Sequence, residues 1–246
     1  MEISEGDWRL SDLKTGDILL FSGRGSISAS IKWATQSPWT HIGMVVAVRE
    51  HEFLCLWEAT RETNILDLDS GLARPGVQLV PLDHRLREYD GHIALRHLHG
   101  VNFDEVELAT LMALRSKLAS RPYQDNKLEL MSAGYARAAS RMGAALRRIA
   151  GLPTTPAPVA KRMLTTERSD GIFCSELVAQ AYQALGLIRC GRFGRPAHKY
   201  TPADFSERGE HLPWLRGQLG PEVWIKRQPQ DRRRLQMLPR TSGRHR

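Results

Sequence analysis

Cys174 lies near the start of the segment GIFCSELVAQAYQALG, residues 171–186, whose apolar spacing predicts a helix that ends at Gly186. The inward face of this helix is expected to contain Leu177, Val178, Ala181 and Leu185. Cys174 belongs to the same face and to the first helical turn. A thiol there faces free N–H groups and the positive end of the helix dipole, which favour the thiolate. The same N–H groups can stabilise an oxyanion, so this position suits a nucleophile.

A nucleophilic thiol also needs a general base and a group that orients this base. His41 opens the apolar strand predicted over 41–48, and Glu58 lies in the next predicted strand, 53–59. If the turn between them has an even number of residues, position 43 pairs with 58, and Glu58 lies diagonal to His41 on one face. An odd turn would direct Glu58 to the other face. Taken one at a time, the three side chains also fit other roles: Cys174 in the core, His41 in a hydrogen-bonded turn and Glu58 at the surface.

Alternating and helical patterns predict the elements that would position these residues. Short β-rich runs predict strands at 16–22, 41–48, 53–59, 76–82, 92–98 and 222–227. Helical spacing predicts a short helix over 26–36 and a longer one that follows Asn102 as its N-cap. The segment TPADF at 201–205 predicts a final turn before the last strand.

Residues 125–169 differ from this pattern because their spacing predicts a basic amphipathic helix. Its apolar stripe contains Met131, Tyr135, Ala138, Met142, Leu146 and Ile149. Its other side contains Arg137, Arg141, Arg147 and Arg148. The helix either docks on the core with its arginines in solvent or serves as a lid or membrane-surface element.

The net charge of the chain is concentrated at its C-terminus. The chain has 246 residues, enough for one large domain or two small ones, and a formal charge of +8. From Ile225 onward, eight lysines and arginines face the single acid Asp231, so residues 225–246 are expected to form a disordered basic tail. This tail either stays solvated or contacts nucleic acid or anionic lipid through its charge.

The remaining cysteines and histidines do not form a recognisable metal motif. Cys55, Cys174 and Cys190 make neither a disulfide framework nor a paired zinc motif, so free thiols in a reducing compartment are expected. Cys55 alternates within an apolar strand as a core residue, and Cys190 lies in a loop. His97 and His99 share a strand face without a third ligand at a typical spacing. No metal and no cofactor are therefore expected.

No targeting or membrane segment is expected. The first residues, MEISEGDWRL, lack the basic and apolar regions of a secretory signal. No apolar run approaches the roughly 18 residues that suggest a membrane span. A cytoplasmic protein is expected, with secretion that needs no cleavable signal as the alternative.

Six motifs follow one another along the chain: TGDILLF, SPWTHIGMVV, WEAT, RPYQDN, FCSELVAQAYQALG and TPADF. Their order resembles the circularly permuted papain-like amidases, the YiiX/YaeF-like group. These are kin of NlpC-type cell-wall peptidases and of lecithin:retinol acyltransferase-like enzymes. The unpermuted relatives place the cysteine helix first, whereas here His41 precedes Cys174. The resemblance covers roughly residues 12–124 and 170–206. The chain departs from it at Thr40, where serine is commoner, and at Gln124, where aspartate is common.

The resemblance implies an α+β, permuted papain-like domain over residues 1–224. Helices would pack on one side of an antiparallel sheet, with the Cys174 helix against the His41 strand. The resemblance makes Cys174 the nucleophile, His41 the general base and Glu58 the third member. Tyr123 and Ser175 would line the oxyanion or substrate region. The 125–169 stretch would be a helical insertion that covers or shapes the substrate site.

These roles imply a cysteine hydrolase that cleaves an amide of a peptide, cell wall or lipid through an acyl thioester. The expected partner is an amide- or ester-bearing substrate, and the oligomeric state stays open. Two alternatives remain. The same site could act as a lipid acyltransferase or thioesterase. The protein could instead be a non-catalytic binding module with a basic tail.

Overall fold

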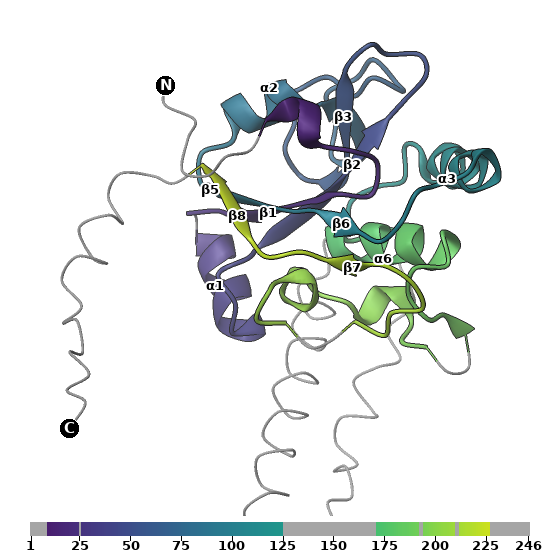
Figure 1. Ribbon diagram of the computed structural model, residues 1–246. Helices are drawn as coiled ribbons and strands as arrows, with labels where there is room; N and C mark the ends of the chain where they lie inside the picture. The colour runs from purple at the N-terminus through teal and green to yellow at the C-terminus, as the bar shows by residue number, and fades with distance from the viewer. Residues whose placement is uncertain (1–8, 25, 125–170, 192–193, 210–211, 227–246) are drawn as a thin grey trace, which may run out of the picture.

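The computed structural model describes residues 9–24, 26–124, 171–191, 194–209 and 212–226 (Figure 1). In these ranges the chain is a mixed α+β protein, which confirms the α+β part of the predicted fold class. Its central six-stranded antiparallel sheet has the order β4-β3-β2-β1-β5-β8. The strands are β1 (Ile18–Ser22), β2 (His41–Ala47), β3 (Leu54–Thr60), β4 (Gly76–Pro81), β5 (His92–Arg96) and β8 (Val223–Lys226). A small second sheet pairs β6 (Leu98–His99) with β7 (Gln218–Leu219).

Helices and short 3₁₀ turns occupy the connections between these strands. The α-helices of the described ranges are α1 (Ser26–Thr35), α2 (Leu82–Glu88), α3 (Glu105–Leu118) and α6 (Cys174–Ala184). The 3₁₀ turns are η1 (Leu10–Asp12), η3 (Ala197–Lys199) and η4 (Pro202–Phe205). The strands predicted from β-rich runs are therefore present, and the run 92–98 is divided at His97 between β5 and β6.

The central sheet is covered on both faces, which corrects the expectation of helices on one side. One core contains Ile18, Leu20, Ile42, Met44 and the α6 residues Leu177 and Val178. The other contains Leu19, Phe21, Val45 and the α2 residues Leu82 and Leu86. Figure 1 shows α2 and α6 on opposite sides of the strands. Leu82 and Leu86 lie one turn apart on α2, which gives this short helix an apolar side for the second face.

The hairpin formed by β2 and β3 has the register predicted from the parity of its connection. Gly43 pairs with Glu58, and Ala47 pairs with Leu54. The connection 48–53 contains an even number of residues. Because side chains alternate along each strand, Glu58 shares a sheet face with His41.

Helix α3 begins later than predicted, because its N-cap is Asp104 and not Asn102. The Asp104 carboxylate accepts the Glu107 backbone N–H at 2.8 Å, and the Glu107 carboxylate accepts the Asp104 N–H at 3.0 Å. This reciprocal capping box fixes the helix start at Glu105. Asn102 stays exposed in the preceding loop.

Two predicted segments fall wholly or mostly outside the described residues. These are the 125–169 insertion with its basic helix and the part of the tail beyond Lys226. The first two tail residues, Ile225 and Lys226, belong to β8. Ile225 is buried in the α2-side core, and the Lys226 Nζ donates to the Tyr89 carbonyl at 2.6 Å. The sheet therefore extends into the segment expected to be disordered.

None of the helices in the described ranges combines the length and apolar composition that crossing a bilayer requires.

Candidate active site

Cys174 is the first residue of α6, as the sequence pattern predicts. The preceding residue, Phe173, has an extended backbone, and its carbonyl accepts the Leu177 N–H at 3.0 Å. The N–H groups before Leu177 belong to the first turn, where an α-helix offers them no acceptor of its own. The Cys174 side chain is buried beside them, with 4% of the residue exposed. The thiol therefore lies at a helix end that can stabilise negative charge.

His41 is the first residue of β2, and Glu58 lies near the end of β3. The His41 Nε2 is 2.5 Å from the Glu58 Oε2. Glu58 is fully buried, whereas the His41 side chain keeps 16% of its surface exposed. Because Nε2 contacts Glu58, Nδ1 is the ring nitrogen that remains for another partner. The ring is therefore oriented by a carboxylate and still accessible.

The thiol lies near the ring, because Cys174 is the neighbour that raises the pKa of His41 most strongly. Burial lowers the pKa of His41, but the charge and hydrogen bond of Cys174, followed by those of Glu58, outweigh it and raise the pKa to about 10. Burial also raises the pKa of Glu58, and here the nearby Arg85 and His41 outweigh it, so the net pKa is lowered. These charges favour an imidazolium at position 41 and a carboxylate at position 58.

Cys174 and His41 approach from opposite sides of the sheet and meet at its end. Helix α6 packs in the core that contains Ile42, whereas the His41 ring lies on the other face, with its centroid 5.2 Å from that of Phe21. Each of the two residues is the first of its own element. The side chains can therefore meet beyond the end of β2.

Arg85 of α2 completes the buried charge network, and sequence reasoning did not identify it. Its Nη2 lies 2.6 Å from the Glu58 Oε1, and both side chains are 1% exposed. Its Nη1 lies 2.6 Å from the Glu62 Oε2 and 3.3 Å from the Asn64 Oδ1. In the sequence, LDHRLRE looks like a charged surface segment, because no local pattern marks an arginine whose partners lie on another element.

Tyr123 lies beside the segment that leads into Cys174. It forms a parallel bridge with Ile172, and its ring centroid is 6.2 Å from that of Phe173. The Arg61 guanidinium lies 5.6 Å from the centre of the same ring. Tyr123 is thus placed next to the residues that precede the thiol, and its role toward a substrate stays a prediction.

Ser175 is adjacent to the thiol, but its hydroxyl points to a different partner. The Ser175 Oγ donates to the Tyr200 carbonyl at 2.7 Å in a buried hydrogen bond. Its backbone N–H belongs to the first turn of α6. Any contribution of Ser175 to an oxyanion site is therefore expected from the backbone and not from the hydroxyl.

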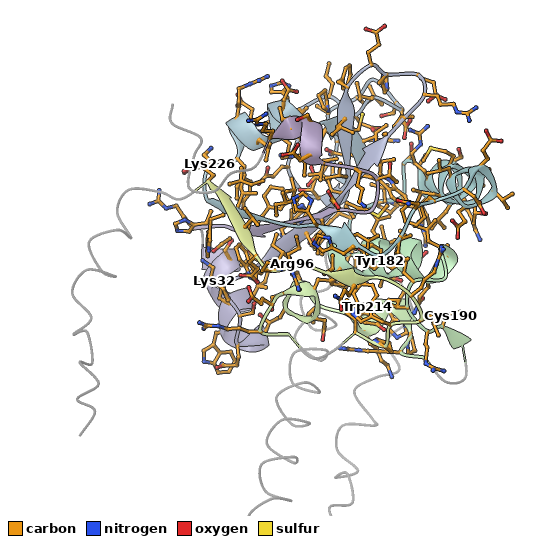
Figure 2. All side chains as sticks on the ribbon, in the orientation of Figure 1. Lys32, Arg96, Tyr182, Cys190, Trp214 and Lys226 are labelled. Atoms are coloured by element: carbon orange, nitrogen blue, oxygen red, sulfur yellow. The ribbon has the colours of Figure 1, made fainter. Side chains whose placement is uncertain are left out.

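Cys55, Cys190 and His97 take no part in the contacts described above. All three cysteines are free; Cys55 is buried, and Cys190 is exposed in the loop after α6 (Figure 2). His97 contacts Asp17, with 2.9 Å between Nδ1 and Oδ2. Within the described ranges, no group of three or more potential ligands is arranged to hold a metal ion.

Comparisons with known proteins found similarity among solved structures. No family model and no curated protein matches the chain. Among solved structures, the chain is similar to the crystal structure of the metalloprotein YiiX from Escherichia coli O157:H7, with 18% sequence identity and a TM-score of 0.44. The match covers 87% of this chain and 97% of that one. The function therefore has to be inferred from the site itself.

Proposed function

We propose that the protein is a cysteine hydrolase that cleaves an amide bond through an acyl-thioester intermediate. The observation that carries this proposal is the His41 ring held 2.5 Å from the Glu58 carboxylate, with the Cys174 thiol near enough to raise the pKa of the ring. A nucleophile, a base and an orienting acid in this order can activate a thiol for attack on a carbonyl. The permuted papain-like arrangement, with the His41 strand before the Cys174 helix, belongs to the same proposal.

In the first step, the Cys174 thiolate attacks the carbonyl carbon, a C–S bond forms, and the carbonyl oxygen becomes an oxyanion. The backbone N–H groups of the first turn of α6 are suited to stabilise this charge. The His41 imidazolium then gives its proton to the leaving nitrogen, and the C–N bond breaks. Glu58 holds the ring in orientation through Nε2. The products are a free amine, an acyl thioester on Cys174 and a neutral His41.

In the second step, neutral His41 takes a proton from water, and the resulting hydroxide attacks the thioester carbon. The C–S bond breaks, the carboxylic acid leaves, and the thiolate and imidazolium return. An amine or alcohol in place of water would give acyl transfer with the same residues. The free thiols of Cys55, Cys174 and Cys190 favour a reducing compartment, and we place the reaction in the cytoplasm.

Trapping the acyl thioester tests this proposal directly. The purified protein is incubated with a fluorescent p-nitrophenyl acyl ester, and the acylated peptide is identified by mass spectrometry. We expect the adduct on Cys174, and Cys174→Ala should remove it. Cys190→Ala is the matched control, because this exposed thiol lies outside the network and its loss should leave labelling unchanged. Equal labelling of wild type and Cys174→Ala would contradict the proposed nucleophile.

The substrate class is tested with the same protein by supplying one acyl donor at a time. Cell-wall peptide fragments, a lipid amide and an acyl-labelled phospholipid are incubated separately, each with and without an added amine. Release of a free acid from either amide, lost in Cys174→Ala, supports the hydrolase. Turnover of the phospholipid alone, with the acyl group recovered on the amine, would replace the hydrolase with an acyltransferase.

A further inference from the structure

Helix α2 contributes a buried cation to a site whose reacting groups lie on other elements. Arg85 is 1% exposed, and its guanidinium lies 2.6 Å from the Glu58 Oε1. The other oxygen of this carboxylate, Oε2, contacts His41 at 2.5 Å. The two oxygens of Glu58 therefore have different partners, and the contact with Arg85 determines which oxygen faces the ring.

We propose that Arg85 is a positioning residue for the reaction assigned to Cys174, acting through Glu58 to hold the His41 ring in its reactive orientation. This inference rests on the proposed function. Arg85 itself lies behind the carboxylate, so it acts on the thiol only through Glu58 and His41.

The guanidinium is itself held from a second direction. Its Nη1 lies 2.6 Å from the Glu62 Oε2 and 3.3 Å from the Asn64 Oδ1, both in the segment that follows β3. The neighbouring α2 residues Leu82 and Leu86 anchor the helix in the core beneath. An arginine fork bound to two carboxylates has little freedom to rotate, so it defines the position of Glu58 more tightly than a single contact would.

The charge of Arg85 matters because Glu58 is fully buried. Arg85 and His41 are the groups that lower the pKa of Glu58 against the opposing effect of burial. During the proposed reaction His41 loses its proton to the leaving group, and its own contribution then disappears. Arg85 keeps its charge throughout, since a guanidinium stays protonated in proteins. It therefore keeps Glu58 ionised and in place while His41 changes its protonation state.

The titratable neighbours of Glu58 come from several elements. His41 lies on β2, Arg85 on α2 and Glu62 in the segment after β3. Tyr89, which follows α2, also interacts with Glu58; burial raises its pKa, so it stays neutral in the range used below. Loss of Arg85 should therefore raise the pKa of Glu58, because burial and the remaining acid Glu62 both favour the protonated form.

The test measures the pH dependence of Cys174 alkylation by iodoacetamide, in the full chain carrying Cys190→Ala. Reaction at Cys174 is followed by peptide mapping, which needs no substrate. Arg85→Met should move the acidic limb of the profile to higher pH. We expect the rate near pH 5.5 to fall about tenfold, the effect of one pKa unit, and the rate near pH 8.5 to return toward that of the parent.

Two controls separate positioning from general damage to the fold. Arg87→Met removes an exposed arginine from the same helix, whose partner Asp83 lies 2.7 Å away at the surface, and it should leave the profile unchanged. In a Glu58→Gln background, Arg85→Met should cause no further shift, because the two act through one contact. A uniform loss of rate at all pH values, or additive effects in the double variant, would overturn the positioning role.

The outcomes also separate this inference from the proposed function. If Arg85→Met does not fold, Arg85→Gln carries the test: it removes the charge beside Glu58 while keeping a polar side chain, and a profile identical to that of the parent would contradict the inference. A shifted alkylation profile without any acyl thioester on Cys174 would leave Arg85 as the positioning residue and remove the hydrolase. An acyl thioester on Cys174 together with an unshifted profile would support the hydrolase and remove the positioning role of Arg85.

Discussion

Two histidine–carboxylate pairs lie at opposite ends of the central sheet, and their carboxylates have different further partners. His41 contacts Glu58 at 2.5 Å, and His97 contacts Asp17 at 2.9 Å. Asp17 precedes β1 and His97 follows β5, whereas His41 opens β2 next to the far end of β1. A histidine beside a carboxylate is thus common to both ends, and the other contacts of each carboxylate decide what the pair can do.

The Asp17 carboxylate is bound mainly to the backbone. Its Oδ1 accepts the Leu98 N–H at 2.8 Å, and its Oδ2 accepts the Lys14 N–H at 3.1 Å. Glu58 instead contacts the charged side chains of His41 and Arg85. A carboxylate that caps backbone groups joins segments of the fold, whereas one held between a cation and an imidazole controls the charge of the ring. The thiol of Cys174 lies at the second kind of pair.

The largest expected difference between the two histidine–carboxylate pairs is in the acylation rate of Cys174. His41→Ala should reduce acylation of Cys174 about 100-fold or more, because the general base and the counter-charge of the thiolate are both lost. His97→Ala should leave acylation within about twofold of wild type. Both rates are measured with the fluorescent acyl ester, per molecule of folded protein. Equal losses in the two variants would mean that the pairs do not differ as described.

The next effect concerns stability and should occur at the other end of the sheet. Asp17→Ala removes the acceptor of two backbone N–H groups and of the His97 ring, and Asp17 is fully buried. Leaving such donors without an acceptor should lower the free energy of unfolding by about 3 kcal/mol. Urea unfolding followed by circular dichroism measures this loss. Acylation of Cys174 in the folded fraction should stay unchanged, and a parallel loss of acylation would contradict the separation of roles.

The same contrast explains which parts of the site could be predicted from the sequence. The position of Cys174 follows from local helix periodicity, and the side of the sheet that carries Glu58 follows from the parity of one connection. Both depend on neighbours in the sequence. Arg85 could not be found in this way, because α2 is short and the ion-pair partner of this buried arginine, Glu58, lies on another element. The covering of both sheet faces depends on the same helix and was missed for the same reason.

The predicted start of α3 was wrong because two neighbouring residues are both suitable N-caps. Asn102 and Asp104 are both good helix caps, and the reciprocal contact with Glu107 selects the second. The motif order, which resembles that of papain-like amidases, carries information on how distant segments would meet, which periodicity does not. The contact between Cys174 and His41 was expected from this resemblance and not from either local pattern.

The smallest expected effects compare two buried hydroxyls, one near each pair. The Ser175 Oγ donates to the Tyr200 carbonyl at 2.7 Å beside the thiol. The Tyr182 Oη donates to the Gly16 carbonyl at 2.7 Å, next to Asp17 in the sequence. Ser175→Ala and Tyr182→Phe each remove one hydrogen bond and should each lower the free energy of unfolding by about 1 kcal/mol in urea titrations.

The two hydroxyl variants differ in what a change of acylation rate would mean. Tyr182→Phe should leave the rate at Cys174 unchanged, because its hydroxyl lies at the other pair. Ser175→Ala should change it by less than about threefold, since the hydroxyl is committed to Tyr200 and the backbone N–H of residue 175 remains. A fall of 100-fold or more, the size typical for loss of an oxyanion donor, would mean that the hydroxyl leaves Tyr200 and binds the developing charge. In that case the start of α6 would have a second conformation, in which the Ser175 hydroxyl leaves the Tyr200 carbonyl and donates to the substrate.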